Sequence, residues 1–267
     1  TQAADREYFH REMKSRVFLL RFAFATAVML AACVGIALIV RALPEGIHSV
    51  FIVMVGGVVF TLILASILEW LVHRYLYHRK QLGALAQIYQ IHHKGHHIKI
   101  FPTKRYTTHL KVRHHPFSEP DISTHYTGLW RNLSSEAAHF SFYMVIGLAL
   151  ICAPAWLLTQ SQLFIASILV TLIIICDLFV SVHDAVHHPD QFRFLESQPW
   201  YPFIERHHYI HHVDMEANVN FLLPLADWCY GTLRTTMTAT EIAKHGTLEK
   251  AKDSPVGCLG AKASLSQ

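Results

Sequence analysis

Cysteine is scarce and scattered in this chain. The sequence holds five, and no two of them form a CxxC pair: Cys33, Cys152, Cys176, Cys229 and Cys258. Three lie in apolar runs, where cysteine usually packs as a small hydrophobic residue. This arrangement excludes a disulfide framework and a thiolate metal site.

Charge is sparse as well. Only 16% of the residues are charged, and the net charge is +4 with histidine counted as neutral. The sequence contains no basic patch interleaved with aromatic residues and no nucleic-acid-binding motif. We therefore expect no nucleic acid partner.

Hydrophobic residues make up 52% of the chain and collect in long runs. A helix needs roughly 20 apolar residues to span a bilayer, and four runs are near that length. They cover residues 17–40, 50–72, 140–158 and 163–182. Short turns join the first run to the second and the third to the fourth. The sequence thus predicts an all-α integral membrane protein with about four transmembrane helices in two hairpins, forming a single membrane domain over residues 1–267.

Lysine and arginine predict the orientation of these helices. Residues 1–21 carry five of them and residues 73–137 carry ten, whereas the turn at 41–49 carries only Arg41. By the positive-inside rule, both termini and the long middle segment are cytosolic, in a bacterial inner membrane or the endoplasmic reticulum. A re-entrant or interfacial first run is the alternative topology, and it changes only the N-terminal side.

Histidine is the unusual component, with 21 residues, most of them in tight groups. The groups read HRYLYH at 73–78, HKGHH at 93–97, HDAVHH at 183–188 and HYIHH at 208–212. Helical residues three and four apart share a face, so we expect the histidines within each of the last three groups to point at one centre. The spacing of five between His73 and His78 requires a helix end or a local bulge.

The histidine groups follow the exits of the second and fourth runs, which the predicted topology places on one face. They are expected to meet in a cytosolic cap of residues 73–139 and 183–234, with a flexible tail at 235–267. Ten histidines exceed what one ion needs, so two ions are the simplest interpretation. An all-imidazole site suits iron, zinc or copper. A pH sensor or a metal-storage tract is the alternative, although a storage tract would be confined to one low-complexity loop.

The four histidine motifs, with the segment NVNFLLPLADWCYGTLR at 218–234, resemble the fatty acid hydroxylase / sterol desaturase superfamily of membrane di-iron proteins. The resemblance covers about residues 69–234. It implies two irons, dioxygen as the oxidant and a lipid or sterol-like substrate. The ligands that it implies are His73, His78, His93, His96, His97, His183, His187, His208, His211 and His212. Further candidate ligands are His92, His188, His207 and His139.

Acidic residues near the motifs are candidates to orient the ligands, because a metal-bound imidazole usually donates its other N–H to a carboxylate or carbonyl. The candidates are Glu69, Asp177, Asp184 and Asp227. Glu69 and Asp177 lie within apolar runs, where an acid is costly and usually functional. Pairing with a nearby arginine at the interface is the alternative for either residue.

The expected function is therefore dioxygen-dependent hydroxylation of an unactivated C–H bond in a lipid or sterol-like substrate, with electrons from a separate ferredoxin or small cytochrome. Desaturation or oxidative cleavage by the same metal pair is the alternative, and zinc could replace iron in the purified protein. A membrane metal transporter or sensor is the alternative of another class. A transporter places polar ligands near the bilayer midplane, whereas these histidines lie outside the runs.

Overall fold

The structure is a computed structural model, and it describes residues 16–44, 46–80, 82–83, 86–100, 106, 144–187 and 193–252. Within these ranges all regular secondary structure is helical, as the sequence predicts.

Three helices are long and apolar enough to cross a membrane. They are α2 (Arg16–Ala42), α3 (Ile47–Leu71) with its π-helical continuation η1 (Val72–Tyr77), and α7 (Gln162–His187). The fourth expected run appears as the shorter apolar helix Met144–Thr159, which contains η5 (Leu148–Cys152) and α6 (Ala153–Thr159). Residues 140–143, where that run was expected to begin, lie outside the described part of the chain.

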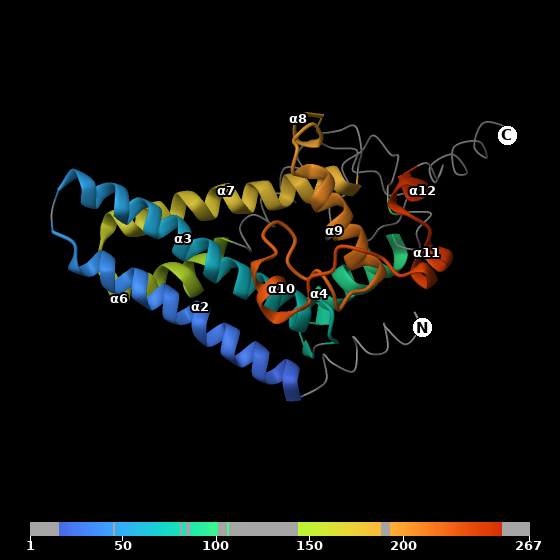
Figure 1. The fold of residues 1–267 in the computed structure, drawn as a ribbon, viewed down its shortest axis with the longest axis horizontal. Helices are drawn as coiled ribbons and strands as arrows, with labels where there is room; N and C mark the ends of the chain where they lie inside the picture. The colour runs from blue at the N-terminus through green and yellow to red at the C-terminus, as the bar shows by residue number, and fades with distance from the viewer. Residues whose placement is uncertain are drawn as a thin grey trace.

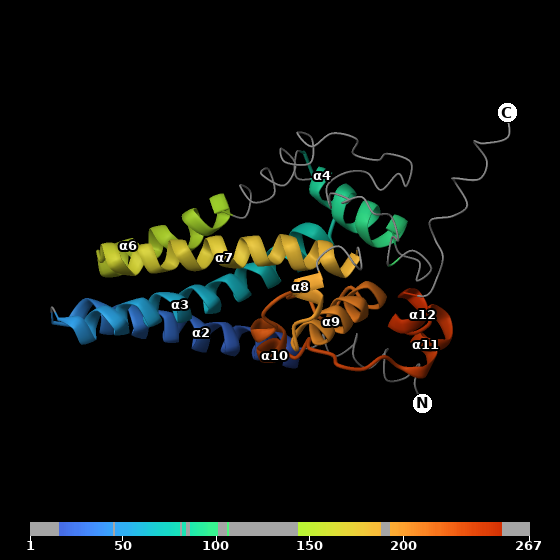
Figure 2. The same ribbon diagram turned by 90° about the horizontal axis from the view of Figure 1, so that it is seen from above.

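The long helices lie side by side in one elongated bundle (Figures 1 and 2). Helices α3 and α7 approach closely where small residues meet. A Cβ added to Gly57 would lie 2.7 Å from Ser167 Oγ, and that hydroxyl donates a hydrogen bond to Met54 O over 2.7 Å. Small residues that allow close backbone approach are typical of helix contacts in membranes. Large apolar side chains such as Phe24, Phe51 and Leu157 are exposed on the outside, as expected of a lipid-facing surface.

Short helices gather at the end of the bundle where η1 and α7 finish (Figures 1 and 2). We call this region the cap. It comprises α4 (Ala86–Tyr89), η3 (Gln90–Ile100), α8 (Arg193–Glu196), α9 (Tyr201–Val213), α10 (Leu225–Tyr230), α11 (Ala239–His245) and α12 (Leu248–Lys252).

Local sequence signals explain where the cap helices begin and end. Helix α9 has a proline in its first turn, where the missing N–H has no intrahelical partner to lose. Helix α11 begins with a capping box, in which Thr238 and Glu241 each accept from the backbone N–H of the other. The segment after residue 234, expected to be flexible, thus contains two short helices before the described chain ends at Lys252.

Polar contacts fix the cap against the bundle. The Arg21 side chain in α2 donates to the backbone carbonyls of Cys229 and Trp228 over 2.9 and 3.0 Å. The guanidinium lies against Gly231, whose φ of 79° is in the left-handed region and where a Cβ would lie 2.4 Å from Arg21 Nη1. Glycine at this helix end therefore both closes α10 and makes room for the arginine.

Candidate metal centre

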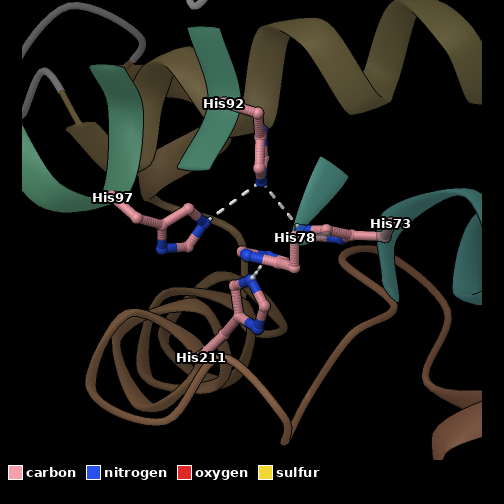
Figure 3. A group of neighbouring side chains, drawn as sticks. All are labelled: His73, His78, His92, His97 and His211. Atoms are coloured by element: carbon pink, nitrogen blue, oxygen red, sulfur yellow. Dashed lines mark hydrogen bonds between the residues drawn. The ribbon is translucent and has the colours of Figure 1, made fainter. Parts of the chain in front are cut away.

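Nine histidines form two adjacent groups. Within each group, one ring nitrogen of every histidine lies within 4.8 Å of those of the others. The first, which we call group A, contains His73, His78, His92, His97 and His211. The second, group B, contains His96, His187, His208 and His212. Figure 3 shows the five rings of group A converging on one centre from η1, η3 and α9. Rings of the two groups touch: His97 stacks on His212 with centroids 4.2 Å apart.

Two π-helical segments bring histidines five residues apart into group A. His78 N donates to His73 O over 3.2 Å at the end of η1, which is the i to i+5 hydrogen bond of a π-helix. The segment η3 is π-helical as well, and its His92 and His97 Nε2 atoms are 3.1 Å apart. In an α-helix, residues five apart point about 140° from each other. The local bulge expected between His73 and His78 is therefore present, and a second one holds His92 with His97.

The π-helical register overturns the expectation that His93, His96 and His97 share one centre. His97 enters group A, His96 enters group B, and His93 enters neither. His93 instead contacts group A from outside, with its Nδ1 3.1 Å from His78 Nδ1. The expectation assumed α-helical spacing, which η3 does not have.

Helix α9 serves both groups. His208 and His212, four residues apart, are on the face that forms group B, with their Nε2 atoms 3.0 Å apart. His211 is turned toward group A, and its Nε2 is 3.2 Å from His78 Nε2. The expectation that all three point at one centre is wrong, because α9 runs between the two groups and presents a different side to each.

Two further histidine candidates among the described residues, His183 and His207, belong to neither group. His183 is buried beside group B, with its ring centroid 4.8 Å from those of His96 and His208. His207 is buried in α9 and donates to Asn220 O over 2.6 Å. His139 and His188 lie outside the described residues, as does the side chain of Asp184.

Backbone carbonyls orient the grouped rings. His187 Nδ1 is 3.0 Å from Tyr106 O, and His211 Nδ1 is 2.8 Å from Ala217 O. Because a carbonyl can only accept, each Nδ1 carries the proton and each Nε2 presents its lone pair to the group. This pattern, with one ring nitrogen fixed by a hydrogen bond and the other free to ligate, is typical of metal-binding histidine.

The spacing of the lone pairs fits metal ions. Two nitrogens bound at right angles, each about 2.1 Å from one ion, lie about 3.0 Å apart. In group A, His92 Nε2 is 3.0 Å from His73 Nε2 and 3.1 Å from His97 Nε2. In group B, His208 Nε2 is 2.9 Å from His187 Nε2 and 3.0 Å from His212 Nε2.

Hydrogen bonds alone do not account for this geometry. A single N–H on His92 or on His208 cannot serve both of its neighbours well. His96 Nε2 is buried and has no hydrogen-bond partner among the described residues. Each group can therefore hold a metal ion.

Burial keeps the cap histidines neutral. Desolvation, and then repulsion from neighbouring histidines, lowers the pKa of His96, His97, His208 and His212 well below 6.5. Desolvation also lowers the pKa of His211 well below that value. A metal competes with protons for imidazole, so low pKa values leave the lone pairs available at neutral pH.

Two of the acidic candidates hold a loop rather than a grouped ring. Glu69 accepts from Phe221 N over 2.6 Å and from Asn220 Nδ2 over 3.2 Å. Asp227, fully buried, accepts from Val219 N over 3.0 Å and from Asn220 N over 2.7 Å. Together they fix the loop between α9 and α10, whose carbonyls receive His211 and His207.

Asp177 is placed differently. Its side chain is exposed on α7, whereas His183 and His187 on the same helix are buried. Residues six apart on an α-helix point about 120° away from each other, so Asp177 and His183 are on different faces. The structure does not bring this carboxylate to either histidine group.

The orienting groups that sequence reasoning missed are main-chain atoms. Tyr106 is fully buried, its carbonyl fixes His187, and its ring centroid is 5.0 Å from that of His187 and 5.2 Å from that of His212. A carbonyl is present at every residue, so no sequence signal marked Tyr106 or Ala217.

An apolar cavity borders group A. It has a volume of about 90 Å³ and lies between α3, α7 and the Met144–Thr159 helix. His73 and Tyr77 line it, and most of the remaining wall is aliphatic: Ala65, Leu68, Glu69, Val72, Ile146, Gly147, Ile151, Leu172, Ile175, Cys176 and Phe179. A histidine of the metal centre is therefore also part of the wall of a hydrocarbon-lined space.

Comparison with known proteins adds no relative: no family model, curated protein or solved structure matches this chain. The geometry of the two histidine groups and the cavity is thus the basis for a function.

Proposed function

We propose that this protein is a membrane-bound, dioxygen-dependent monooxygenase in which two iron ions occupy groups A and B and a C–H bond of a lipid-like substrate is hydroxylated. One observation carries the proposal: two adjacent all-imidazole groups lie at one end of the bundle, and His73 of group A also lines the apolar cavity. The motif resemblance to membrane di-iron hydroxylases supports iron as the working metal. Zinc suits the same ligands and can replace iron in the purified protein.

The chain's own residues position the site and keep it dry. Nine imidazoles would hold the ions, and their orientation is set by carbonyls such as those of Tyr106 and Ala217. When bound, a reduced iron pair supplies the dioxygen chemistry that protein side chains lack. The aliphatic wall of the cavity favours a hydrocarbon over water beside His73, which is the protein's contribution to selectivity.

Location and electron supply complete the proposal. The lysine and arginine distribution favours a cytosolic cap and cytosolic termini. Electrons come from a separate donor, a ferredoxin or small cytochrome, that docks on the cytosolic side. Desaturation or oxidative cleavage uses the same residues, and the product decides among them. A metal transporter is less well supported, because both histidine groups lie at one end of the bundle rather than along it.

Metal counting and product analysis test this proposal. The protein, expressed with iron, is expected to hold two ions per chain and to add one oxygen atom to a membrane lipid, read by mass spectrometry. Loss of two hydrogens instead would indicate desaturation. His211→Ala and His208→Ala are each expected to lower the metal content by about one ion, since each removes a ligand from one group. His245→Ala, outside both groups, is the matched control.

A second pair of variants tests the register of η3. His92→Ala is expected to lower the metal content, whereas His93→Ala leaves it within about a tenth of the parent value, because only His92 lies in a group. Absence of both metal and oxidised product from the parent protein would refute the proposed function.

A further inference from the structure

The cavity beside His73 runs along the membrane-spanning helices rather than across them. On α3 and the start of η1 its wall is a stripe spaced as one helix face: Ala65, Leu68, Glu69, Val72 and His73. From Ala65 to His73 this stripe extends about 12 Å along the helix axis. The cavity is therefore longer than it is wide, with one end at the cap and the other inside the bundle.

The size and lining of the cavity determine the shape of the ligand that it can hold. A volume of about 90 Å³ that extends along about 12 Å of helix makes the cavity narrow. Opposite the α3 stripe, Leu172 and Ile175 on α7 and Ile151 on η5 present only hydrocarbon. Such a long, narrow space matches a single unbranched chain better than a fused ring system, which is wider than one chain.

The direction of the chain follows from the position of the cap. In the leaflet on the cap side, lipid tails point from the headgroups toward the bilayer centre. His73, Tyr77 and Phe179 line the cap end of the cavity, and Phe179 stacks on His183 with centroids 6.1 Å apart. Ala65, Ile151 and Leu172 line the inner end.

We propose that this cavity binds one unbranched hydrocarbon chain of a lipid from the cap-side leaflet, with its methyl end at Ala65 and Ile151 and its reacting carbons at His73. The statement that the carbons at His73 react rests on the proposed function, but binding of the chain requires no turnover. Gly147 and Leu172 both line the cavity and lie close together. A Cβ added to Gly147 would lie 3.0 Å from Cδ1 and Cδ2 of Leu172.

Photolabelling tests chain binding without turnover. A linear fatty acid with a mid-chain diazirine is added to the full-length protein in phosphatidylcholine vesicles, and labelled peptides are located by mass spectrometry. Labelling is expected at the cavity residues Ile151, Leu172 and Ile175 above the background at lipid-exposed Leu150 and Leu157. An excess of unlabelled linear fatty acid removes the cavity signal, and an excess of cholesterol does not.

Glycine variants connect the signal to the cavity. Gly147→Leu fills the space and is expected to lower cavity labelling about tenfold, by the cost of overpacking. Gly35→Leu is the matched control, because nothing lies within 4 Å of a Cβ at Gly35. If Gly147→Leu loses its metal and its fold, the milder Gly147→Ala decides: it lowers labelling, and Leu172→Ala in the same chain restores it.

The outcomes separate the two proposals. Cavity labelling without metal or oxidised product supports the binding site and refutes the monooxygenase proposal. Oxidised product without competable cavity labelling supports the monooxygenase proposal and overturns the binding site. Labelling that is spread evenly over lipid-exposed residues, or that is unchanged in the Gly147 variants, also overturns the binding site.

Discussion

Replacing Asp227 by alanine should loosen the loop that orients the histidines. The carboxylate is fully buried and accepts from the backbone N–H groups of Val219 and Asn220 and from the Thr232 hydroxyl. It reaches no grouped ring, so its effect passes through the loop. Alanine removes the acceptor and leaves these buried donors without their carboxylate partner.

The magnitude follows from counting the unsatisfied groups. Each buried donor left without a partner costs about 1–3 kcal/mol. Part of this is offset, because burial raises the pKa of Asp227 to about 6 and the charged form is itself costly to bury. We expect a loss of about 3 kcal/mol, which corresponds to a fall in Tm of about 6–12 °C for a chain of this size. Asp227→Asn keeps the shape and one acceptor oxygen, so its loss should be about half as large.

The assay is thermal unfolding of the detergent-solubilised protein, together with its metal content. Asp177→Ala is the matched control, because that aspartate is exposed and its removal should leave Tm within about 2 °C. Metal affinity should fall about tenfold in Asp227→Ala, since the carbonyls that receive His211 and His207 are on the loop. If Asp227→Ala has the same Tm as the Asp177→Ala control, the loop does not depend on this carboxylate and the reasoning fails.

Two further predictions follow from charge and from backbone conformation. Burial lowers the pKa of His207 from 6.5 to about 4, so the stabilisation from its neutral form is complete above pH 6.5 and is lost as the pH falls toward 4. Asp227, with its raised pKa, acts in the opposite direction below pH 6, but the buried cap histidines outnumber it. Tm should therefore fall on acidification from pH 7 to pH 5, and an unchanged or rising Tm would contradict the neutral-histidine interpretation. Gly231→Ala should lower the free energy of unfolding by about 1–3 kcal/mol, because φ is positive there and the methyl group meets Arg21. Gly83→Ala, with a positive φ in open space, is the control. Equal losses of stability in the two variants would show that the arginine contact is unimportant.

The helical class and the histidine clustering could be predicted because both follow from residue types and their spacing along the sequence. Apolar runs located α2, α3 and α7 to within a few residues at most ends. The odd spacing of His73 and His78 indicated a break from α-helical geometry, and η1 supplies one. Nothing comparable marked η3, since the HKGHH sequence is compatible with an ordinary α-helix.

The assignment of histidines to centres could not be predicted for the same reason. One extra residue per π-helical turn moves a ring from one side of a helix to another. Tertiary packing decides whether the segment adopts the α-helical or the π-helical conformation. His92 and His93 are adjacent in sequence, yet only His92 enters a group. Which of two neighbouring histidines turns inward depends on the rings that face it from η1 and α9.

Acidic residues were the natural candidates for orienting the ligands, yet the described contacts to grouped rings come from carbonyls. A carboxylate within a metal-binding group carries its charge into the site, whereas a carbonyl orients the imidazole without adding charge. Glu69 and Asp227 act one step further out, through the loop that both of them hold. The chain path, rather than the residue type, determines which carbonyl lies at hydrogen-bond distance.

The contact between Glu69 and the loop sets an order for making this protein. The hydrogen-bond partners of Glu69, Asn220 and Phe221, follow it in the chain by 151 and 152 residues. During synthesis, α3 therefore enters the membrane long before the groups that satisfy its carboxyl are translated. Groups A and B are incomplete until His211 and His212 have left the ribosome. A metal ion that needs either complete group can therefore bind only late in synthesis, and a chain that stops before the loop lacks both complete groups.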